Sequence, residues 1–321
     1  SDANFRRAYN TMDTLLKKVK GIATSSASFS LASIRPLYMR VRKLLKENAP
    51  TEVTDAAADQ LLSVWLGTET YSTGTYVYVP PYSKVGTLST SRVPKPPGSI
   101  RIVIVSDTHE RHGLLDIPDG DVLLHTGDFL MMNPLFSTAR SLEKMREFNE
   151  WLGRLPHAEK ILIGGNHDKI LETLGKDASQ EILSNCTYLE NDFVELSCGI
   201  SVFGTPASKR NSAFSPNDAF QYSVADLKDI VRAAPLKCDV FMCHGPPDSL
   251  PPVMEYIETN PESPQLCIFG HIHERHGVEV FGDNGRIVLG LNGAVLGQGF
   301  HPSRAPIVHD FIPKTSRTSK L

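Results

Sequence analysis

Five short apolar runs in this chain are each followed by side chains that can bind a metal ion. The runs are Ile102–Val105, Asp121–His125, Lys160–Ile163, Val240–Met242 and Leu266–Phe269. Short runs rich in β-branched residues are typical of strands buried on both faces of a parallel sheet. In open α/β sheets, functional groups gather at the carboxyl ends of the strands. The pattern therefore predicts an α/β fold in which five strand ends contribute to one site.

The motifs after these runs supply two carboxylates, a side-chain amide and several imidazoles. They read Asp107-Thr-His109, Gly127-Asp128, Gly165-Asn166-His167-Asp168, Cys243-His244-Gly245 and Gly270-His271-Ile-His273. Asp107 and His109 are two residues apart, so in extended backbone their side chains point the same way and can bind one ion. The carboxylate of Asp128 can bridge two ions, and the amide oxygen of Asn166 is a neutral ligand. Together the motifs predict a pair of divalent metal ions.

The ligand types indicate which metals the site would take. Oxygen and imidazole ligands without a thiolate favour Mn²⁺, with Fe or Zn²⁺ as alternatives, and fit a structural zinc site poorly. Each motif alone has an ordinary explanation, since Asp-x-His and Gly-Asp pairs are common in turns. Their order and their place after apolar runs favour the metal site. We expect His125 to support the turn before Gly127 rather than to bind metal.

The motifs resemble those of the calcineurin-like metallophosphoesterase superfamily. Four further segments are similar to its metallophosphoesterase-domain-containing subfamily of class III phosphodiesterases: Phe148–Pro156, Cys186–Leu189, Phe203–Pro206 and His244–Pro247. The resemblance covers about residues 98–313 and implies a four-layer αββα sandwich. It implies one metal held by Asp107, His109, Asp128 and His273. The second metal would be held by Asp128, Asn166, His244 and His271, with Asp128 bridging.

These ligands predict hydrolysis of phosphate esters. Two ions about 3.5–4 Å apart can lower the pKa of a bridging water, and the resulting hydroxide would attack phosphorus. His167 is predicted to protonate the leaving group as a general acid. Asp168 is predicted to orient the imidazole of His167, as the partner of a general acid commonly does.

The choice between a diester and a monoester depends on the charge of the phosphate. Protein phosphatases of this superfamily carry an arginine shortly after Gly-Asp, whereas here no arginine follows Asp128 until Arg140. This difference favours a phosphodiesterase, and the resemblance implies cyclic nucleotides as one substrate class. Arg111 and Asn292 are candidate substrate contacts. The alternatives are a phosphomonoesterase or protein phosphatase, and a non-catalytic metal-binding scaffold.

The N-terminal region differs in charge from the rest of the chain. Residues 1–50 contain ten Lys and Arg against three acidic residues, although the whole chain has a net charge of −3. Apolar residues recur there at helical spacing, so we expect a basic, mostly helical extension over residues 1–78. It is predicted to pack on the acidic remainder of the chain, or else to bind a membrane surface or an acidic protein. We expect a Pro/Ser-rich linker at 79–99, a calcineurin-like metallophosphoesterase domain at 100–313 and a disordered tail at 314–321.

The composition agrees with a globular intracellular enzyme. With 321 residues, 40% of them hydrophobic, the chain can bury a large core. No apolar run reaches the ~18 residues of a bilayer-spanning helix, and no signal-peptide pattern is present, so a cytoplasmic protein is expected. The five cysteines form no C-x-x-C pair and are expected to be reduced. No basic patch with interleaved aromatic residues lies near the motifs, so nucleic-acid recognition is not expected.

Overall fold

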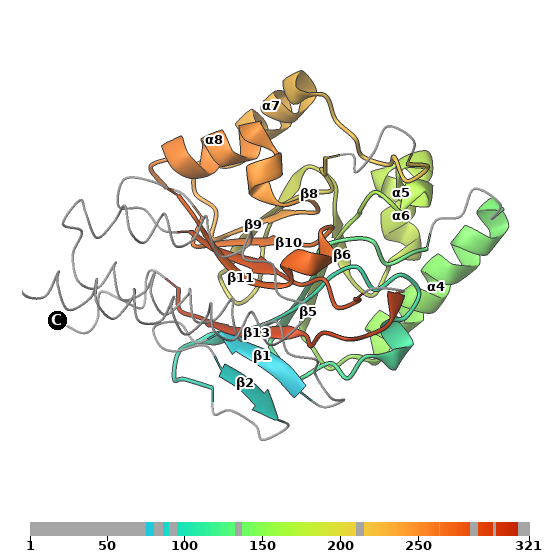
Figure 1. Ribbon diagram of the computed structural model, residues 1–321, viewed down its shortest axis with the longest axis horizontal. Helices are drawn as coiled ribbons and strands as arrows, with labels where there is room; N and C mark the ends of the chain where they lie inside the picture. Colours follow the sequence, from blue (N-terminus) through green and yellow to red (C-terminus); the bar gives the residue numbers. More distant parts are fainter. Residues whose placement is uncertain are drawn as a thin grey trace, which may run out of the picture.

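Two β-sheets lie at the centre of the molecule (Figure 1). The computed structural model describes residues 75–79, 86–89, 95–131, 137–209, 215–262, 264–282, 288–297 and 300–313. In spatial order, the first sheet contains β2 (Gly86–Ser89), β1 (Thr75–Val79), β13 (Ile307–Phe311), β3 (Ile100–Val105), β4 (Val122–His125), β5 (Glu159–Ile163) and β6 (Thr187–Leu189). The second sheet contains β11 (Gly277–Phe281), β12 (Val288–Asn292), β10 (Leu266–Phe269), β9 (Val240–Cys243), β8 (Ser201–Thr205) and β7 (Asp192–Glu195).

Parallel pairing brings the functional strand ends to one edge of each sheet. β3, β4, β5 and β6 are parallel neighbours in the first sheet, and β8, β9, β10 and β12 are parallel neighbours in the second. Their register places Val105 opposite His125, and His125 opposite Leu162, at the carboxyl ends. In the described part of the chain, short 3-10 helices follow β3, β9 and β10: η1 (His112–Leu114), η2 (Pro247–Ser249) and η3 (His273–Arg275). All five predicted apolar runs are strands of these parallel sets.

Alternate residues of the buried strands face different cores. In β3, Ile102 and Ile104 belong to the core between the two sheets, whereas Val103 and Val105 belong to a core beneath helices. The helices over this second core are α4 (Thr138–Arg154), α5 (Lys169–Leu174) and α6 (Lys176–Ile182). Phe148 of α4 is fully buried in it. A strand that is apolar at every position is therefore explained by a covering layer on each side.

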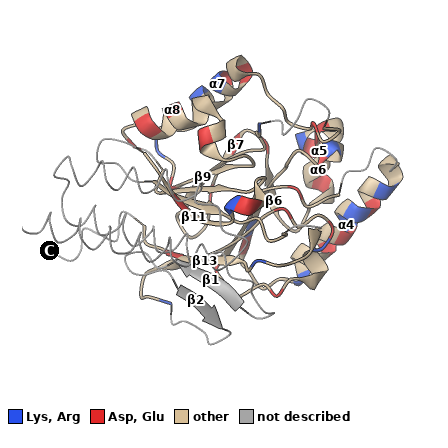
Figure 2. Ribbon diagram, in the orientation of Figure 1, with Lys and Arg blue, Asp and Glu red and all other residues tan. Residues whose placement is uncertain are grey.

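The outer face of the second sheet is covered by α7 (Val224–Ala233) and α8 (Pro251–Thr259). Leu227 of α7 and Ile257 of α8 pack with Phe241 of β9 in a third core. Figure 1 shows α7 and α8 together above β8 to β10, with α4 to α6 in a separate group. In Figure 2 the charged residues of the described part lie mainly on the helices, and the strands are mostly uncharged. The order helix, sheet, sheet, helix confirms the predicted αββα sandwich.

Strands β1 and β2 correct the expectation of a helical extension to residue 78 and a linker over 79–99. β1 pairs in parallel with β13, and β2 pairs antiparallel with β1, so both extend the first sheet. Thr75–Val79 alternates β-branched and aromatic residues, a composition that fits a pleated strand better than a helix. The sheet therefore begins before the predicted domain boundary.

Other predictions concern residues outside the described ranges. The basic helices expected in residues 1–50 and the tail at 314–321 lie there, so a membrane or acidic partner for the N-terminal segment stays a prediction. Within the described residues, no helix combines the length and apolar character that a bilayer crossing requires. The cytoplasmic location also stays a prediction.

Candidate metal centre

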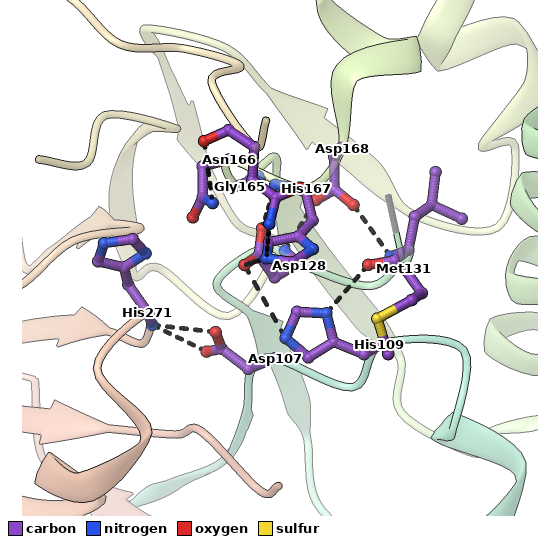
Figure 3. Close-up of polar contacts among 12 residues, drawn as sticks. Asp107, His109, Asp128, Met131, Gly165, Asn166, His167, Asp168 and His271 are labelled. Atoms are coloured by element: carbon purple, nitrogen blue, oxygen red, sulfur yellow. Dashed lines mark hydrogen bonds and ion pairs between the residues drawn. The ribbon is translucent and has the colours of Figure 1, made fainter. Parts of the chain in front are cut away.

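Side chains from five strand ends meet at one place. Figure 3 shows Asp107, Asp128, Asn166 and His271 pointing toward a common centre. Their ligand atoms and those of neighbouring residues form overlapping groups whose atoms lie within 4.8 Å of one another: Asp107, His109 and His273; His109, Asp128 and His167; and Asp128, His244 and His271. Asn166 joins through His244, as described below. The structure therefore brings together all seven residues predicted as metal ligands.

The carboxylate of Asp128 lies where these groups overlap. Its Oδ2 atom is 3.3 Å from Nε2 of His244, 3.9 Å from Nε2 of His167 and 4.0 Å from Nε2 of His109. Its Oδ1 atom accepts a 2.8 Å hydrogen bond from the backbone N–H of His167. A buried carboxylate with one oxygen near imidazoles on both sides can bridge two cations.

Asp107, His109 and His273 form what we call the first ligand group. Nε2 of His273 is 3.2 Å from Oδ1 of Asp107 and 3.4 Å from Nε2 of His109. Asp107 and His109 are buried, whereas His273 keeps 16% of its side chain exposed. The backbone N–H of His271 donates to Oδ2 of Asp107 at 2.9 Å, which fixes the carboxylate from the side of β10.

Asn166, His244 and His271 form the second ligand group. Nε2 of His244 is 3.1 Å from Oδ1 of Asn166, and the rings of His244 and His271 are 5.0 Å apart. The amide nitrogen of Asn166 donates to the carbonyl of Asn217 at 3.4 Å, so its oxygen is directed toward His244. All three members of this group are buried. Asp128 lies between the two groups and contacts both.

Three of the imidazoles are held by backbone carbonyls. The carbonyl belongs to Leu130 for Nδ1 of His109 (3.0 Å), to Thr126 for Nδ1 of His244 (2.7 Å) and to Lys209 for Nε2 of His271 (3.0 Å). An imidazole that donates one N–H to a carbonyl offers a lone pair at its other nitrogen, and this is the usual arrangement around a protein-bound metal. The residues present therefore fit two divalent cations. The atoms that would face the cations are Nε2 of His109, Nε2 of His244 and Nδ1 of His271.

The backbone of four predicted ligands is left-handed. The φ angle is 53° at Asp107, 39° at His109, 54° at Asp128 and 65° at His271. Residues other than glycine adopt this region at a cost of roughly 1–3 kcal/mol, and such residues cluster at functional sites. Hydrogen bonds from Asp107 N–H to the carbonyl of Gly127 and from His109 N–H to the carbonyl of Asp128, both 3.0 Å, hold the two loops in this conformation.

Two glycines allow the loops to approach the carboxylates. A Cβ atom on Gly165 would overlap Oδ1 of Asp128, and a Cβ atom on Gly270 would overlap Oδ2 of Asp107. The glycine in each motif is therefore required by close contact with the ligand of another strand. This explains why the sequence places a glycine directly before Asn166 and before His271.

The two carboxylates are ionised. Burial alone would raise the pKa of Asp107, but the hydrogen bond and the charge of His273 outweigh it and hold that pKa well below its usual range. Burial acts in the same way on Asp128, where the charges of His244 and His167 dominate and lower the pKa. Both acids are therefore in the form that binds a cation.

The imidazoles divide into neutral and protonated members. Burial lowers the pKa of His109 and of His271 to about 4, so both rings are neutral at pH 7. Burial would also lower the pKa of His244, but the charge of Asp128 and its hydrogen bond raise it to about 10. A cation that binds at His244 must therefore displace a proton from it.

Asp168 contacts backbone N–H groups rather than the imidazole of His167. Its carboxylate accepts hydrogen bonds from the N–H groups of Asp128 (2.8 Å), Leu130 (3.0 Å) and Gly165 (2.9 Å). Among its described contacts, none is with the ring of His167. The prediction that Asp168 orients this ring is therefore wrong. The fully buried carboxylate instead accepts hydrogen bonds from backbone N–H groups of the loops after β4 and β5, and so positions Asp128.

The ring of His167 is contacted by Asn217, which sequence reasoning missed. Nε2 of His167 is 2.8 Å from the amide nitrogen of Asn217, and 13% of the His167 side chain is exposed. The rings of His167 and His109 are 4.6 Å apart. Asn217 lies in a loop that follows no apolar run, so its position carries no sequence signal of the kind that reveals the other residues.

The two predicted substrate contacts, Asn292 and Arg111, differ in their surroundings. Asn292 is fully buried; its amide donates to the carbonyl of Ile272 at 3.0 Å and accepts from the N–H of Ala294 at 3.0 Å. It ties the loop between His271 and His273 to β12, which corrects the prediction of a substrate contact. Arg111 is exposed, and its side chain makes no hydrogen bond or ion pair within the described part of the chain. Its substrate role stays a prediction.

His125 supports the turn before Gly127, as expected. Its Nδ1 atom is 3.3 Å from the N–H of Gly127, and its Nε2 atom is 3.2 Å from the hydroxyl of Thr108.

Two residues after β12, Phe300 and Arg304, also interact with residues of the centre and were not predicted. The ring of Phe300 lies 4.9 Å from the ring of His109 and 6.1 Å from that of His273. Burial lowers the pKa of Arg304, whereas the charges of Glu274 and Asp107 act in the opposite direction. The segment that carries them has no strand-like or metal-binding pattern, so nothing in the sequence indicated it.

Comparison with known proteins agrees with this geometry. The sequence pattern of the calcineurin-like phosphoesterases matches residues 100–275, a range that includes every predicted ligand. The chain is 31% identical over 258 residues to metallophosphoesterase domain-containing protein 1 of Homo sapiens, covering 70% of this chain and 74% of that protein. It is 31% identical over 253 residues to a UPF0046 protein of Caenorhabditis elegans, and the match covers 69% of this chain and 84% of that protein.

A structural comparison gives weaker similarity. The crystal structure of TT1561 of Thermus thermophilus covers 66% of this chain and 88% of its own, with 11% sequence identity and a TM-score of 0.40. The sequence matches, together with the converging carboxylates and imidazoles, indicate a metal-dependent phosphoesterase. The chain belongs to the calcineurin-like phosphoesterase family.

Proposed function

We propose that the chain is a phosphodiesterase that uses two divalent metal ions. The observation that carries this proposal is the position of Asp128, whose Oδ2 atom lies 3.3 Å from His244 and 4.0 Å from His109 and so reaches both ligand groups. The first ion would be held by Asp107, His109, Asp128 and His273, and the second by Asp128, Asn166, His244 and His271. Mn²⁺ is the expected metal, with Fe and Zn²⁺ as alternatives, because the donors are carboxylate, amide and imidazole.

The chain's own residues would position the reacting phosphate. Two divalent cations, when bound, polarise a phosphoryl oxygen and lower the pKa of a bound water. The carbonyls that hold three of the imidazoles keep the ligand atoms in fixed orientations. The three hydrogen bonds to Asp168 keep the loop of Asp128 in place. A preorganised site of this kind needs little rearrangement during the reaction.

His167 is the proposed general acid for the leaving group. It lies 3.9 Å from Asp128 and 4.6 Å from the ring of His109, and it is partly exposed toward solvent. The side-chain amide of Asn217 can donate to Nε2 of this imidazole or, after rotation, accept a hydrogen bond from it. Asn217 can therefore hold the ring in both protonation states. This property suits a residue that gives up a proton and recovers it.

The arginines of the described part support a diester rather than a monoester substrate. The guanidinium of Arg140 donates to Oε2 of Glu110 at 3.0 Å, so its charge is paired. The guanidinium of Arg304 interacts electrostatically with Asp107 and donates to the carbonyl of Leu296. A monoester dianion carries more negative charge than a diester and needs an additional cationic contact. Both guanidinium groups are already hydrogen-bonded, so in the described part of the chain these two arginines supply no additional cationic contact, and this favours the diester.

The test is hydrolysis of bis-p-nitrophenyl phosphate alongside p-nitrophenyl phosphate. The protein is stripped with a chelator and reconstituted with Mn²⁺, Fe²⁺ or Zn²⁺ in separate samples. We expect a kcat/KM at least about tenfold higher for the diester, with the largest value in Mn²⁺; one factor of ten corresponds to roughly 1.4 kcal/mol. Cyclic nucleotides are the next diesters to test. The Asp128→Ala protein is the matched control, because it should lose both ions.

Each other outcome assigns a different function. A preference for the monoester would contradict the proposal and indicate a phosphomonoesterase. Two bound ions without hydrolysis of either compound, in all three metals, would instead indicate a metal-binding scaffold.

A further inference from the structure

Phe300 is an exposed aromatic residue beside the first ligand group. Its ring is nearly perpendicular to that of His109, at 84°, with centroids 4.9 Å apart, and it lies 6.1 Å from the ring of His273. The residue is 38% exposed. An aromatic ring that leaves its remaining surface to solvent next to a polar centre is an available stacking surface.

The backbone of Phe300 is held in an unusual conformation. Its φ angle is 56°, which for a bulky side chain is rare and requires support from the surrounding structure. Its N–H donates to the carbonyl of Gly297 at 3.2 Å, and the N–H of Gly297 donates to the carbonyl of His301 at 3.0 Å. These two hydrogen bonds hold the backbone at Phe300.

The same turn is tied to the loop that carries Asp107. The N–H of Arg304 donates to the carbonyl of Val295 at 3.1 Å, and the guanidinium of Arg304 donates to the carbonyl of Leu296. The N–H of Val295 in turn donates to the carbonyl of Ser106 at 3.1 Å, one residue before Asp107. Hydrogen bonds thus link the segment that carries Phe300 to the loop of Asp107.

The site therefore has a polar part and a flat apolar part next to each other. The imidazoles of His109 and His167 and the carboxylate of Asp128 form the polar part, and Phe300 contacts the His109 ring from another side. A phosphate ester bound at the polar part would place one of its organic groups within reach of Phe300. Phe300 lies outside residues 100–275, the range that matches the family.

We propose that Phe300 is a specificity-determining residue that stacks against a planar ring of the phosphate ester, either an aryl group or a nucleobase. This inference rests on the proposed function, because it requires a phosphoryl group at the metal centre. The competing explanation is structural: Phe300 would only shield His109 and His273 from water. A purely structural role predicts a change in metal binding, whereas stacking predicts a change in ligand selectivity.

The experiment compares Phe300→Asn with Phe300→Tyr. Asn tolerates left-handed backbone, so the first variant removes the ring without adding backbone strain, and the second variant keeps a ring. The matched control is Phe193→Asn, because Phe193 is 37% exposed and lies on β7 in the second sheet. Thermal unfolding and bound Mn²⁺ are measured for each protein before ligands are added.

Binding to the Mn²⁺-loaded proteins is measured by calorimetry with two pairs of ligands. Phenylphosphonate is compared with methylphosphonate, and adenosine 5′-monophosphate with ribose 5-phosphate, so each pair differs by one ring system. We expect Phe300→Asn to raise the Kd of the ring-bearing ligand of a pair by about tenfold, the scale of one stacking contact. The Kd of the other ligand of that pair should rise by less than about twofold. Phe300→Tyr should restore binding, and Phe193→Asn should leave both members unchanged.

If Phe300→Asn binds phenylphosphonate more weakly but adenosine 5′-monophosphate normally, the result supports stacking on small aryl esters. If it binds only adenosine 5′-monophosphate more weakly, the result supports stacking on nucleotides. Equal weakening within both pairs, loss of bound Mn²⁺ from Phe300→Asn, or absence of binding by all four ligands to the wild-type protein would overturn the inference. The measurement needs no turnover. A failed diester preference would therefore count against the proposed function and leave the ligand selectivity at Phe300 as a separate result.

Discussion

The two ligand groups use the same residue types but are enclosed to different degrees. In the second group, His244 is fully buried and His271 is 7% exposed, and both rings are held by backbone carbonyls. In the first group, His109 is held in the same way, but 16% of the His273 side chain is exposed. Among the described hydrogen bonds and ion pairs, those of the His273 ring are with Asp107 and His109 rather than with a carbonyl.

This difference shows how burial divides the roles of the centre. The second group is enclosed by the protein, so an ion there would be fixed by the fold. The first group lies toward solvent, and the partly exposed His167 and the exposed Phe300 both contact its member His109. The side chains best placed to meet a substrate therefore surround the more open group.

Replacement of Asp128 should produce the largest effect, because its carboxylate contacts both groups. Asp128→Ala should reduce bound Mn²⁺ from two ions toward none and lower turnover by about a thousandfold or more, the scale of losing a major electrostatic group. Elemental analysis of the purified protein measures the metal content. Retention of both ions would contradict the bridging assignment and show that the two groups are independent.

Replacement of His167 should separate catalysis from metal binding. His167→Ala should keep both ions but lower kcat by about a hundredfold to a thousandfold, the usual contribution of a general acid. The matched control is His301→Ala, since His301 is also a histidine but is exposed and outside both ligand groups. An unchanged kcat would remove His167 from the acid role, whereas lost metal would make it a ligand.

The paired variants His271→Gln and His273→Gln compare the two groups directly. Each variant should lower the affinity for one ion by about tenfold to a hundredfold and leave the other ion bound, since each removes one coordinating side chain. In the wild-type protein, a chelator should remove the ion of the more exposed first group faster. His273→Gln should therefore eliminate the fast phase and His271→Gln the slow phase. A single phase in the wild type would contradict the difference in enclosure.

The sequence predicted the closed parts of the molecule well because burial leaves strong patterns. The run Ile102–Val105 is apolar at every position because it is covered by a layer on each side, and this feature is visible in the order of the amino acids alone. The ligands follow such runs, so their convergence could be inferred from the rule for parallel strand ends. The glycines in the motifs also indicated close packing, because a Cβ atom at Gly165 or Gly270 would overlap a carboxylate of another motif.

The sequence was a poorer guide to the loop residues around the metal centre and to the direction of individual side chains. Asn217 and Phe300 lie in loops, where no periodic pattern marks a residue as functional. Asp168 directly follows His167, and neighbouring residues in a turn point in different directions, so adjacency did not imply contact. Asn292 is the last residue of β12, close to the edge of the sheet where the ligands lie, but its amide is used by backbone groups. The partner that each of these polar side chains contacts depends on which residues the fold places next to it.

The smallest expected effect is a pH dependence of stability in protein stripped of metal. The pKa of His244 is about 10 in the folded state, against 6.5 for an ordinary imidazole, because Asp128 outweighs burial. Between these values the folded protein binds more protons than the unfolded chain, so stability should fall as pH rises from 6.5 toward 10. The pKa of His109 and of His271 is about 4, so stability should rise with pH between 4 and 6.5.

The melting temperature of the stripped protein should therefore be highest near pH 6.5. His244→Gln should abolish much of the alkaline decline, since no protonated imidazole then pairs with Asp128. His273 adds to the decline with the same sign, because its hydrogen bond to Asp107 outweighs burial and raises its pKa. Saturating Mn²⁺ should flatten the decline, because a bound cation has already displaced the proton from His244. A decline that persists in His244→Gln at its full size would show that the more open His273, not the enclosed His244, carries the charge.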